Sequence, residues 1–175
     1  LAARGDRVRA LVRRPEPALS LPGVEVALGD ATDPGALARA VAGADVVFHL
    51  AGVRRATERD EFFRVNVGST RLLLDACVAH APGLRRFVLA GSRAASPPSA
   101  TGCTEDAPPR PSEAYGESKA EAERVAFQYA ERLPIAVARP PRIMGPGDRE
   151  NLLFFQLAQR GWALRFGADA PLSWI

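Results

Sequence analysis

Short apolar runs of strand character alternate with longer helical segments along the chain, and this order constrains the fold more than any other feature. Most runs are apolar at successive positions, as in strands buried on both faces. Strands that alternate with helices at this spacing form a parallel sheet covered by helices. The sequence therefore predicts an α/β fold with a doubly wound parallel sheet, with strands at 7–12, 24–28, 45–52, 86–92 and 135–140 and helices at 34–43, 62–81 and 112–133.

Local signals mark where some of these elements begin and end. Asp33 before Pro34 is typical of a helix N-cap followed by proline at the first helical position, and Gly43 closes the same helix. The opening LAARG resembles the last turn of a helix capped by Gly5, which leads into a strand. We therefore expect a domain that starts inside the fold and stops within an incomplete element at residues 167–175.

Composition and charge exclude several classes of protein. The 175 residues are 47% hydrophobic and 25% charged, as in one globular domain. The net charge of +3 comes from arginines interleaved with acids, without the clustered basic face that nucleic acid requires. Two cysteines cannot form a disulfide framework, and no secretory or membrane-spanning apolar stretch is present. These features favour a reducing cytoplasm and argue against nucleic-acid or membrane partners.

Tyr115 and Lys119 stand four residues apart in a predicted helix, and Lys119 is the only lysine among 23 Lys and Arg residues. Residues i and i+4 lie on one helix face, so the two side chains project side by side. A nearby cation lowers the pKa of a phenol toward neutral pH, which makes the phenol useful in proton transfer. The alternative is a chance pair on an amphipathic helix, with the tyrosine half-buried and the lysine solvated.

Four motifs follow one another in a characteristic order: GDATD (29–33), HLAGVRRA (49–56), FVLAGS (87–92), and YGESKAEAE (115–123) with RPPRIMGPGD (139–148) after it. In this order they resemble the extended short-chain dehydrogenase/reductases, the NAD-dependent epimerase/dehydratase family. The resemblance runs over residues 1–175. It implies a Rossmann-type NAD(P)-binding domain in which residues 141–175 begin the substrate-binding portion.

The resemblance also implies the catalytic roles. Tyr115 would be the general acid/base at a substrate hydroxyl or carbonyl, and Lys119 would bind the nicotinamide ribose and lower the pKa of the tyrosine. Ser92, at the carboxyl end of its strand, would hydrogen-bond the same substrate oxygen, as expected for ligands of open parallel sheets. The alternative for Ser92 is a turn former before a Ser/Pro-rich loop.

Cofactor contacts are implied mainly at the ends of strands. Asp30 and Ala31 would lie at the adenine, Leu50 to Gly52 would lay their backbone along the cofactor, and Arg54 would reach the pyrophosphate. An Asx-turn or capping role is the alternative for Asp30, and a solvated side chain is the alternative for Arg54. The full set is Arg13, Arg14, Asp30, Ala31, Leu50, Ala51, Gly52, Arg54, Asn66, Tyr115, Lys119, Pro140 and Ile143.

The choice between the two nicotinamide cofactors depends on the end of the strand at 7–12. An acid there accepts from the ribose hydroxyls of NAD, whereas arginine accommodates the 2′-phosphate of NADP. Arg13 and Arg14 follow this strand, with no acid before Glu16. The sequence favours NADP, with NAD possible. Solvated loop arginines are the alternative.

The sequence departs from the family at two places. The glycine-rich turn that cradles the pyrophosphate at a helix N-terminus is not in the sequence, so we expect this chain to bind cofactor weakly or not at all. The loop after Ser92 lacks the aromatic residue that sugar-nucleotide epimerases carry there. The substrate is left open between a carbonyl or hydroxyl compound and a nucleotide sugar.

Other functions receive less support. Cys77 and His80 have metal-ligand spacing without a second pair, so core packing explains both better than metal binding. His49 lies in an apolar strand, where a core histidine is favoured over a catalytic one. Two functions remain: an NAD(P)-dependent oxidoreductase or epimerase, and a non-catalytic dinucleotide-binding sensor or scaffold. The set Ser92, Tyr115 and Lys119 favours the enzyme. The resemblance further implies a homodimer that packs through its long helices.

Overall fold

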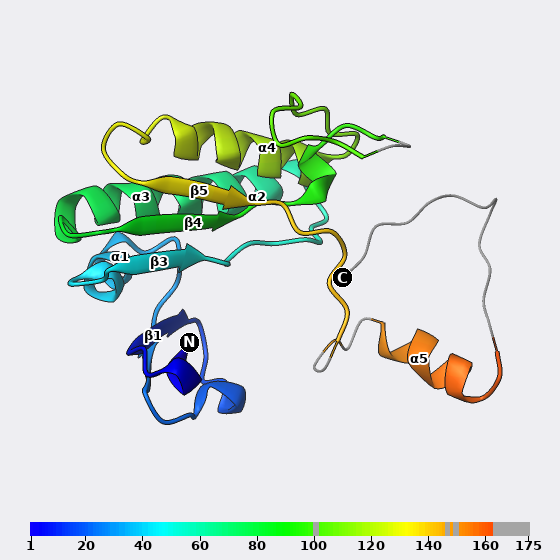
Figure 1. The fold of residues 1–175 in the computed structure, drawn as a ribbon, viewed down its shortest axis with the longest axis horizontal. Coiled ribbons are helices and arrows are strands. Elements are labelled where there is room, and N and C mark those ends of the chain that lie inside the picture. The colour runs from blue at the N-terminus through cyan, green and yellow to red at the C-terminus, as the bar shows by residue number, and fades with distance from the viewer. Residues whose placement is uncertain (100–101, 146–147, 149–150, 163–175) are drawn as a thin grey trace.

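The computed structural model describes residues 1–99, 102–145, 148 and 151–162, and it contains parallel strands and helices in the predicted alternation (Figure 1). Residues 163–175 of the expected substrate-binding portion lie outside the described residues. The strands are β1 (Val8–Val12), β2 (Val24–Leu28), β3 (Val46–His49), β4 (Arg86–Ala90) and β5 (Ile135–Ala138). The helices are α1 (Pro34–Val41), α2 (Arg59–Phe62), α3 (Gly68–His80), α4 (Ala114–Phe127) and α5 (Leu152–Gln159).

All strand pairs are parallel, which confirms the predicted α/β class. β1 pairs with β2 from Val8 opposite Val24 to Val12 opposite Leu28. β4 lies between β3 and β5 in a second sheet. The strands thus form two sheets, although the sequence suggested one, because no ladder in the described part of the chain joins β1 or β2 to β3. Figure 1 shows the smaller sheet beyond β3, on the side away from β4.

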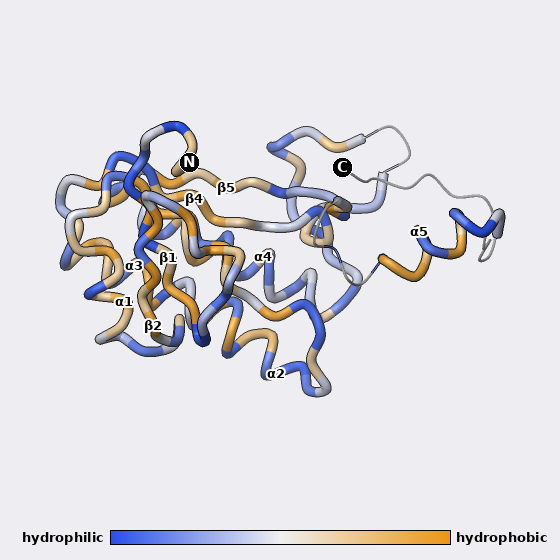
Figure 2. The backbone as a smooth tube through the Cα atoms, turned by 90° about the horizontal axis from the view of Figure 1, so that it is seen from below, coloured by the Kyte–Doolittle hydropathy of each residue, from blue (hydrophilic) through white to orange (hydrophobic). Residues whose placement is uncertain are grey.

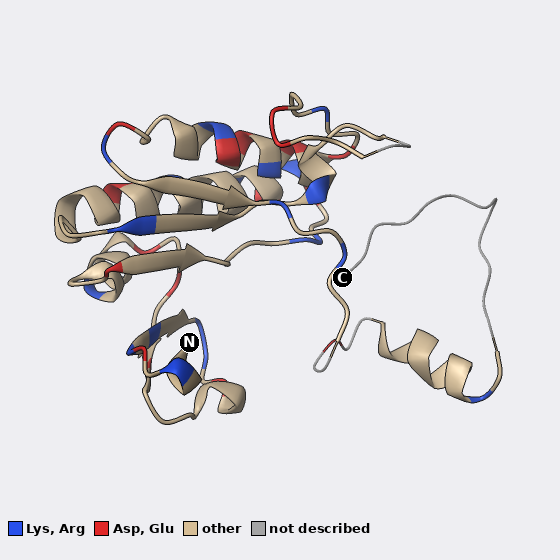
Figure 3. Ribbon diagram, in the orientation of Figure 1, with Lys and Arg blue, Asp and Glu red and all other residues tan. Residues whose placement is uncertain are grey.

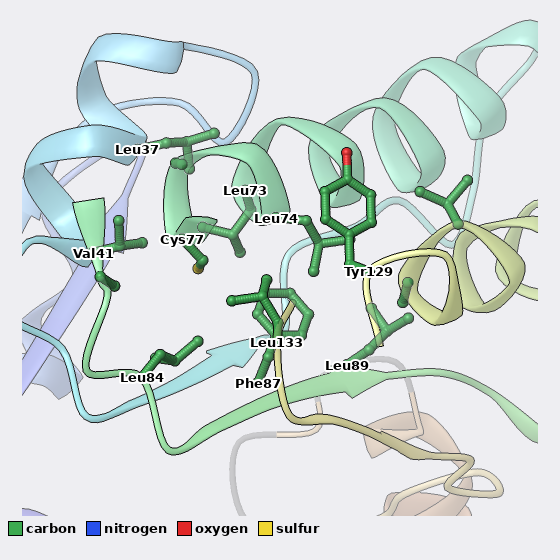
Figure 4. Close-up of a cluster of buried hydrophobic side chains, with 14 of the residues drawn as sticks. Leu37, Val41, Leu73, Leu74, Cys77, Leu84, Phe87, Leu89, Tyr129 and Leu133 are labelled. Carbon is green, nitrogen blue, oxygen red and sulfur yellow. The ribbon is translucent and has the colours of Figure 1, made fainter. Parts of the chain in front are cut away.

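Helices α1, α3 and α4 lie together on one side of the three-stranded sheet (Figure 2). Their apolar side chains meet those of β4 in the core, where Leu74, Cys77 and Phe87 are fully buried (Figure 4). On the other face of β3, Val46 and Phe48 are 38% and 47% exposed. The burial of alternate β3 residues shows that helices cover one face of this sheet in the described structure.

The predicted caps are present. The Asp33 side chain accepts a hydrogen bond from Gly35 N, and Pro34 occupies the first position of α1. Gly5 has a φ of 87° and closes a 3₁₀ turn, Ala2–Arg4, where the sequence suggested the end of a helix. The predicted helix 62–81 begins earlier, at Arg59, and includes a π-helical turn, Phe63–Val67, between α2 and α3.

Surface features add little to the functional argument. Basic and acidic residues are interspersed along α4 in the view of Figure 3. α5 stands apart from the sheets, and its apolar side chains are 44–59% exposed at residues 152–155. Across the described residues, no helix combines the length and apolar character needed to cross a membrane.

Candidate active site

Ser92, Tyr115 and Lys119 are brought to the carboxyl end of β4. Ser92 follows this strand by two residues, and α4 carries Tyr115 and Lys119 in its first two turns. Gly116 sets the distance between the two elements, because a Cβ at this position would lie 2.3 Å from the carbonyl oxygen of Ala94. Only glycine lets the turn after Ser92 approach the start of α4 this closely.

Lys119 is buried, and its ammonium donates a hydrogen bond to the carbonyl oxygen of Ala90, the last residue of β4. Burial lowers the pKa of this lysine, and the negative charge of Glu123 partly opposes the effect. The predicted solvated alternative for Lys119 is therefore wrong. The side chain lies inside the protein, and its ammonium is located at the carboxyl end of β4.

Tyr115 is half-buried, and its ring packs edge-on against Phe62, with 6.2 Å between the ring centroids. The Ser92 hydroxyl oxygen accepts a hydrogen bond from Ala94 N at 3.1 Å and so caps the 3₁₀ turn Arg93–Ala95. The turn-forming role proposed for Ser92 is present. Its catalytic role remains a prediction, since a hydroxyl can serve a turn and a ligand together.

Asn66 joins the segment after β3 to α4. Its side chain is 2% exposed, accepts from Val53 N at 2.8 Å, and donates to Val53 O at 3.0 Å and to Ser118 Oγ at 2.9 Å. Gly52 must be glycine here, since a Cβ would lie 2.8 Å from Asn66 Oδ1. The π-helical turn carries Asn66, and such turns are frequent at functional sites. Asn66 thus fixes the segment after β3 against α4, and its role at a cofactor stays a prediction.

His49 is connected to Asn66 through Thr70 and extends this polar network into β3. Its Nε2 lies 3.1 Å from Thr70 Oγ1 and 3.3 Å from Ser69 Oγ, and Thr70 donates to Asn66 O at 2.7 Å. Burial, with a smaller contribution from the positive charge of Lys119, lowers the pKa of His49 to about 4. The residue is a neutral core histidine with hydrogen-bond partners, as the sequence indicated. Cys77 is also buried in the core, whereas His80 is exposed, so the core packing predicted for His80 is wrong.

The predicted cofactor contacts line the carboxyl ends of the strands without forming one cluster. Asp30 Oδ1 accepts from Thr32 N at 2.8 Å and Thr32 Oγ1 at 2.7 Å, which forms the Asx turn given as its alternative. These hydrogen bonds lower the pKa of Asp30, with smaller contributions from the charges of Arg13 and Arg64. Pro140 O accepts from Arg93 N at 3.1 Å, beside Ser92. The exposed members are Arg13, Arg14, Leu50, Ala51, Gly52, Arg54 and Ile143, and Ala31 is half-buried.

Residues 1–160 match the sequence model described as the NAD dependent epimerase/dehydratase family. The chain belongs to this family. The predicted recognition as an extended short-chain dehydrogenase/reductase of this family is therefore confirmed.

The chain is similar to ceramide reductase of Caulobacter vibrioides, with 40% identity over 162 residues that cover 91% of this chain and 46% of the relative. It is 34% identical to a 3 beta-hydroxysteroid dehydrogenase/Delta 5-->4-isomerase of Mycobacterium tuberculosis strain H37Rv over 163 residues, 85% of this chain and 44% of the relative. It also resembles the structure of MoeE5 in complex with UDP-glucose and NAD, with a TM-score of 0.76 and 31% identity. The match covers 91% of this chain and 55% of the MoeE5 chain. The chain spans about half the length of these relatives.

Three parts of the candidate site were not predicted from the sequence. Ser118 links Asn66 to α4 and donates to Tyr115 O at 2.7 Å, and its position three residues after Tyr115 was the only available signal. The buried pair Glu123 and Arg139 was also missed, although both residues lie inside the family motifs. The π-helical turn around Asn66 has no recognisable sequence signal.

Proposed function

We propose that this chain forms the cofactor-binding and catalytic part of an NAD(P)-dependent oxidoreductase that interconverts a carbinol and a carbonyl carbon. The observation that carries the proposal is the junction of β4 and α4, where the buried ammonium of Lys119 lies at Ala90 O, and Gly116 brings the Ser92 turn against the Tyr115 turn. A dinucleotide sensor would not require a phenol and a buried ammonium on one helix face, so this junction favours the enzyme.

A bound nicotinamide would supply or accept a hydride. Tyr115 would donate its proton to the carbonyl oxygen in reduction and take it back in oxidation, which is general acid/base catalysis. Ser92 would hydrogen-bond the same oxygen and orient it. Lys119 would bind a ribose hydroxyl and supply positive charge beside the phenol. The exposed segment from Leu50 to Gly52 would offer its backbone groups to an extended ligand.

Arg13 and Arg14 support NADP as the preferred cofactor. Both are exposed directly after β1, and the charge of Arg13 contributes to lowering the pKa of Asp30 at the end of β2. Two guanidinium groups beside neighbouring strand ends favour a 2′-phosphate over a free hydroxyl. NAD is the alternative, because the related structure of MoeE5 contains it.

A carbonyl compound is the substrate class that we favour over a nucleotide sugar. Ceramide reductase and the hydroxysteroid dehydrogenase share 40% and 34% identity with this chain, and both names describe oxidation or reduction of a lipid. MoeE5, which was solved with UDP-glucose, is 31% identical. The loop after Ser92 also lacks an aromatic residue between 93 and 112, which agrees with the reductase.

Dinucleotide titrations test the proposal on the protein extended at its amino end by the family's glycine-rich turn. Fluorescence titration with NADPH and NADH compares wild type with Tyr115→Phe and Lys119→Met. We expect tighter binding of NADPH than NADH, retained binding in Tyr115→Phe, and at least about tenfold weaker binding in Lys119→Met, because a charged hydrogen bond is lost. A folded wild type that binds neither dinucleotide would refute the proposal.

A further inference from the structure

Glu123 is a buried carboxylate that the proposed reaction does not use. It lies one helical turn after Lys119 on α4, and its side chain is 2% exposed. Its Oε2 accepts from Arg139 Nε at 2.9 Å and Nη2 at 2.7 Å, while its Oε1 is buried and has no hydrogen-bond partner among the described residues. A buried carboxylate with an unpaired oxygen is costly, so a purely stabilising role explains it poorly.

The unpaired oxygen lies against the residue that precedes Ser92. A Cβ at Gly91 would lie 2.4 Å from Glu123 Oε1, so the carboxylate contacts the backbone of the turn after β4 directly. Lys119 donates to the carbonyl oxygen of Ala90, the residue before Gly91. Two charged side chains from successive turns of α4 therefore contact two successive residues that lead into Ser92: Lys119 by a hydrogen bond to Ala90 and Glu123 by packing against Gly91.

Arg139 extends this contact to the neighbouring strand. It follows β5 directly, and the next residue, Pro140, accepts a hydrogen bond from Arg93 N at 3.1 Å. The ion pair thus connects α4 to the end of β5, and Pro140 connects that end to the turn that begins at Ser92. These contacts come from both neighbouring elements and involve the residues on either side of Ser92.

Among the described residues, the charged and titratable groups near Lys119 lie on α4, on β3 and at the end of β5. Glu123 supplies the negative charge from α4, and Arg139 at the end of β5 is paired with Glu123 itself. His49 on β3 interacts electrostatically with Lys119 but is neutral above a pKa of about 4. Tyr115 is the other titratable group on the same face of α4.

We infer that Glu123 is a positioning residue: paired with Arg139, it holds the Ala90–Ser92 turn beside α4, and its negative charge stabilises the ammonium of Lys119. The role in catalysis rests on the proposed function, because Lys119 acts on a ligand only there. The electrostatic part holds for the chain without any ligand.

The single lysine makes this electrostatic role directly measurable. In the 175-residue chain, carried on a tag without lysine and labelled with ¹³C-lysine, the Lys119 signal is followed by NMR against pH. Burial places its midpoint below that of an exposed lysine in wild type. Glu123→Gln, which keeps an oxygen acceptor for Arg139, should lower the midpoint further. Glu121→Gln removes the same charge from a residue paired with Arg124 and should leave it unchanged.

An unchanged Lys119 midpoint in folded Glu123→Gln would overturn the inference. If that variant does not fold, Glu123→Asp replaces it. The shorter side chain moves the carboxylate away from its position in wild type, so a Lys119 midpoint equal to that of wild type is then the contradicting result. The titration needs no dinucleotide, so its failure is separate from failure of the proposed function. In the extended protein, the loss of NADPH affinity at alkaline pH should begin at lower pH in Glu123→Gln than in Glu121→Gln.

Discussion

Replacing Gly116 by alanine should destabilise the protein, although the same change usually strengthens a helix. Alanine gains up to about 1 kcal/mol over glycine in a helix interior. In α4, however, the new Cβ would lie 2.3 Å from Ala94 O and 3.0 Å from Pro111 Cβ. A carbon and an oxygen in contact are ordinarily about 3.3 Å apart, so the backbone of the turn after Ser92 would have to move by about 1 Å.

Overpacking of this kind costs about 1–3 kcal/mol, which cancels or exceeds the helical gain and leaves a net loss of about 0–2 kcal/mol. Gly68→Ala is the matched control, because Gly68 has helical φ and ψ of −60° and −48° and its Cβ would meet nothing within 4 Å. The control should gain up to about 1 kcal/mol. The two variants should therefore differ by about 1–3 kcal/mol.

Urea unfolding followed by circular dichroism measures this difference, and thermal melts should show it as roughly 2–12 °C in Tm for a domain of this size. In the extended protein, the proposed function further predicts that Gly116→Ala reduces turnover, because the turn of Ser92 moves relative to Tyr115 and a displacement of about 1 Å costs up to roughly 100-fold. Equal stabilisation by both substitutions would refute the close contact between the two elements.

Two further predictions concern the core. Phe87→Ala should cost about 3–5 kcal/mol in urea unfolding, because Phe87 is fully buried, whereas Phe127→Ala, at a side chain 54% exposed, should cost well under half of that; similar losses would contradict the assigned core. His49 has a folded pKa of about 4, below its unfolded value near 6.5, so its contribution to stability is complete above about pH 6.5 and falls as pH decreases toward 4, by about 3 kcal/mol at most. The free energy of unfolding, measured between pH 4 and 7, should no longer depend on pH in this way in His49→Gln, and it should keep the dependence in His80→Gln. The same pH dependence in both variants would show that His49 is not the group responsible.

The sequence predicted those elements whose burial follows from local pattern. The run at β4 was identified because apolar residues follow one another, and Phe87 and Leu89 are indeed buried. Asp33 was identified because capping depends on the residues beside it. The division into two sheets could not be predicted, because strand pairing depends on residues far apart in sequence. The Asn66 contacts were missed for the same reason, since Val53 and Ser118 lie 13 and 52 residues away.

Ser92 shows why residue-by-residue alternatives can mislead. Sequence reasoning opposed a turn-forming role to a catalytic one, yet a serine hydroxyl has one donor and two acceptor positions. The cap on Ala94 N uses one acceptor position and leaves the O–H group able to donate to a substrate oxygen. The cap also fixes the side chain in one orientation before a ligand binds, which lowers the entropic cost of orienting it during the reaction. The turn therefore supports the catalytic role proposed for Ser92, and the two interpretations describe the same hydroxyl.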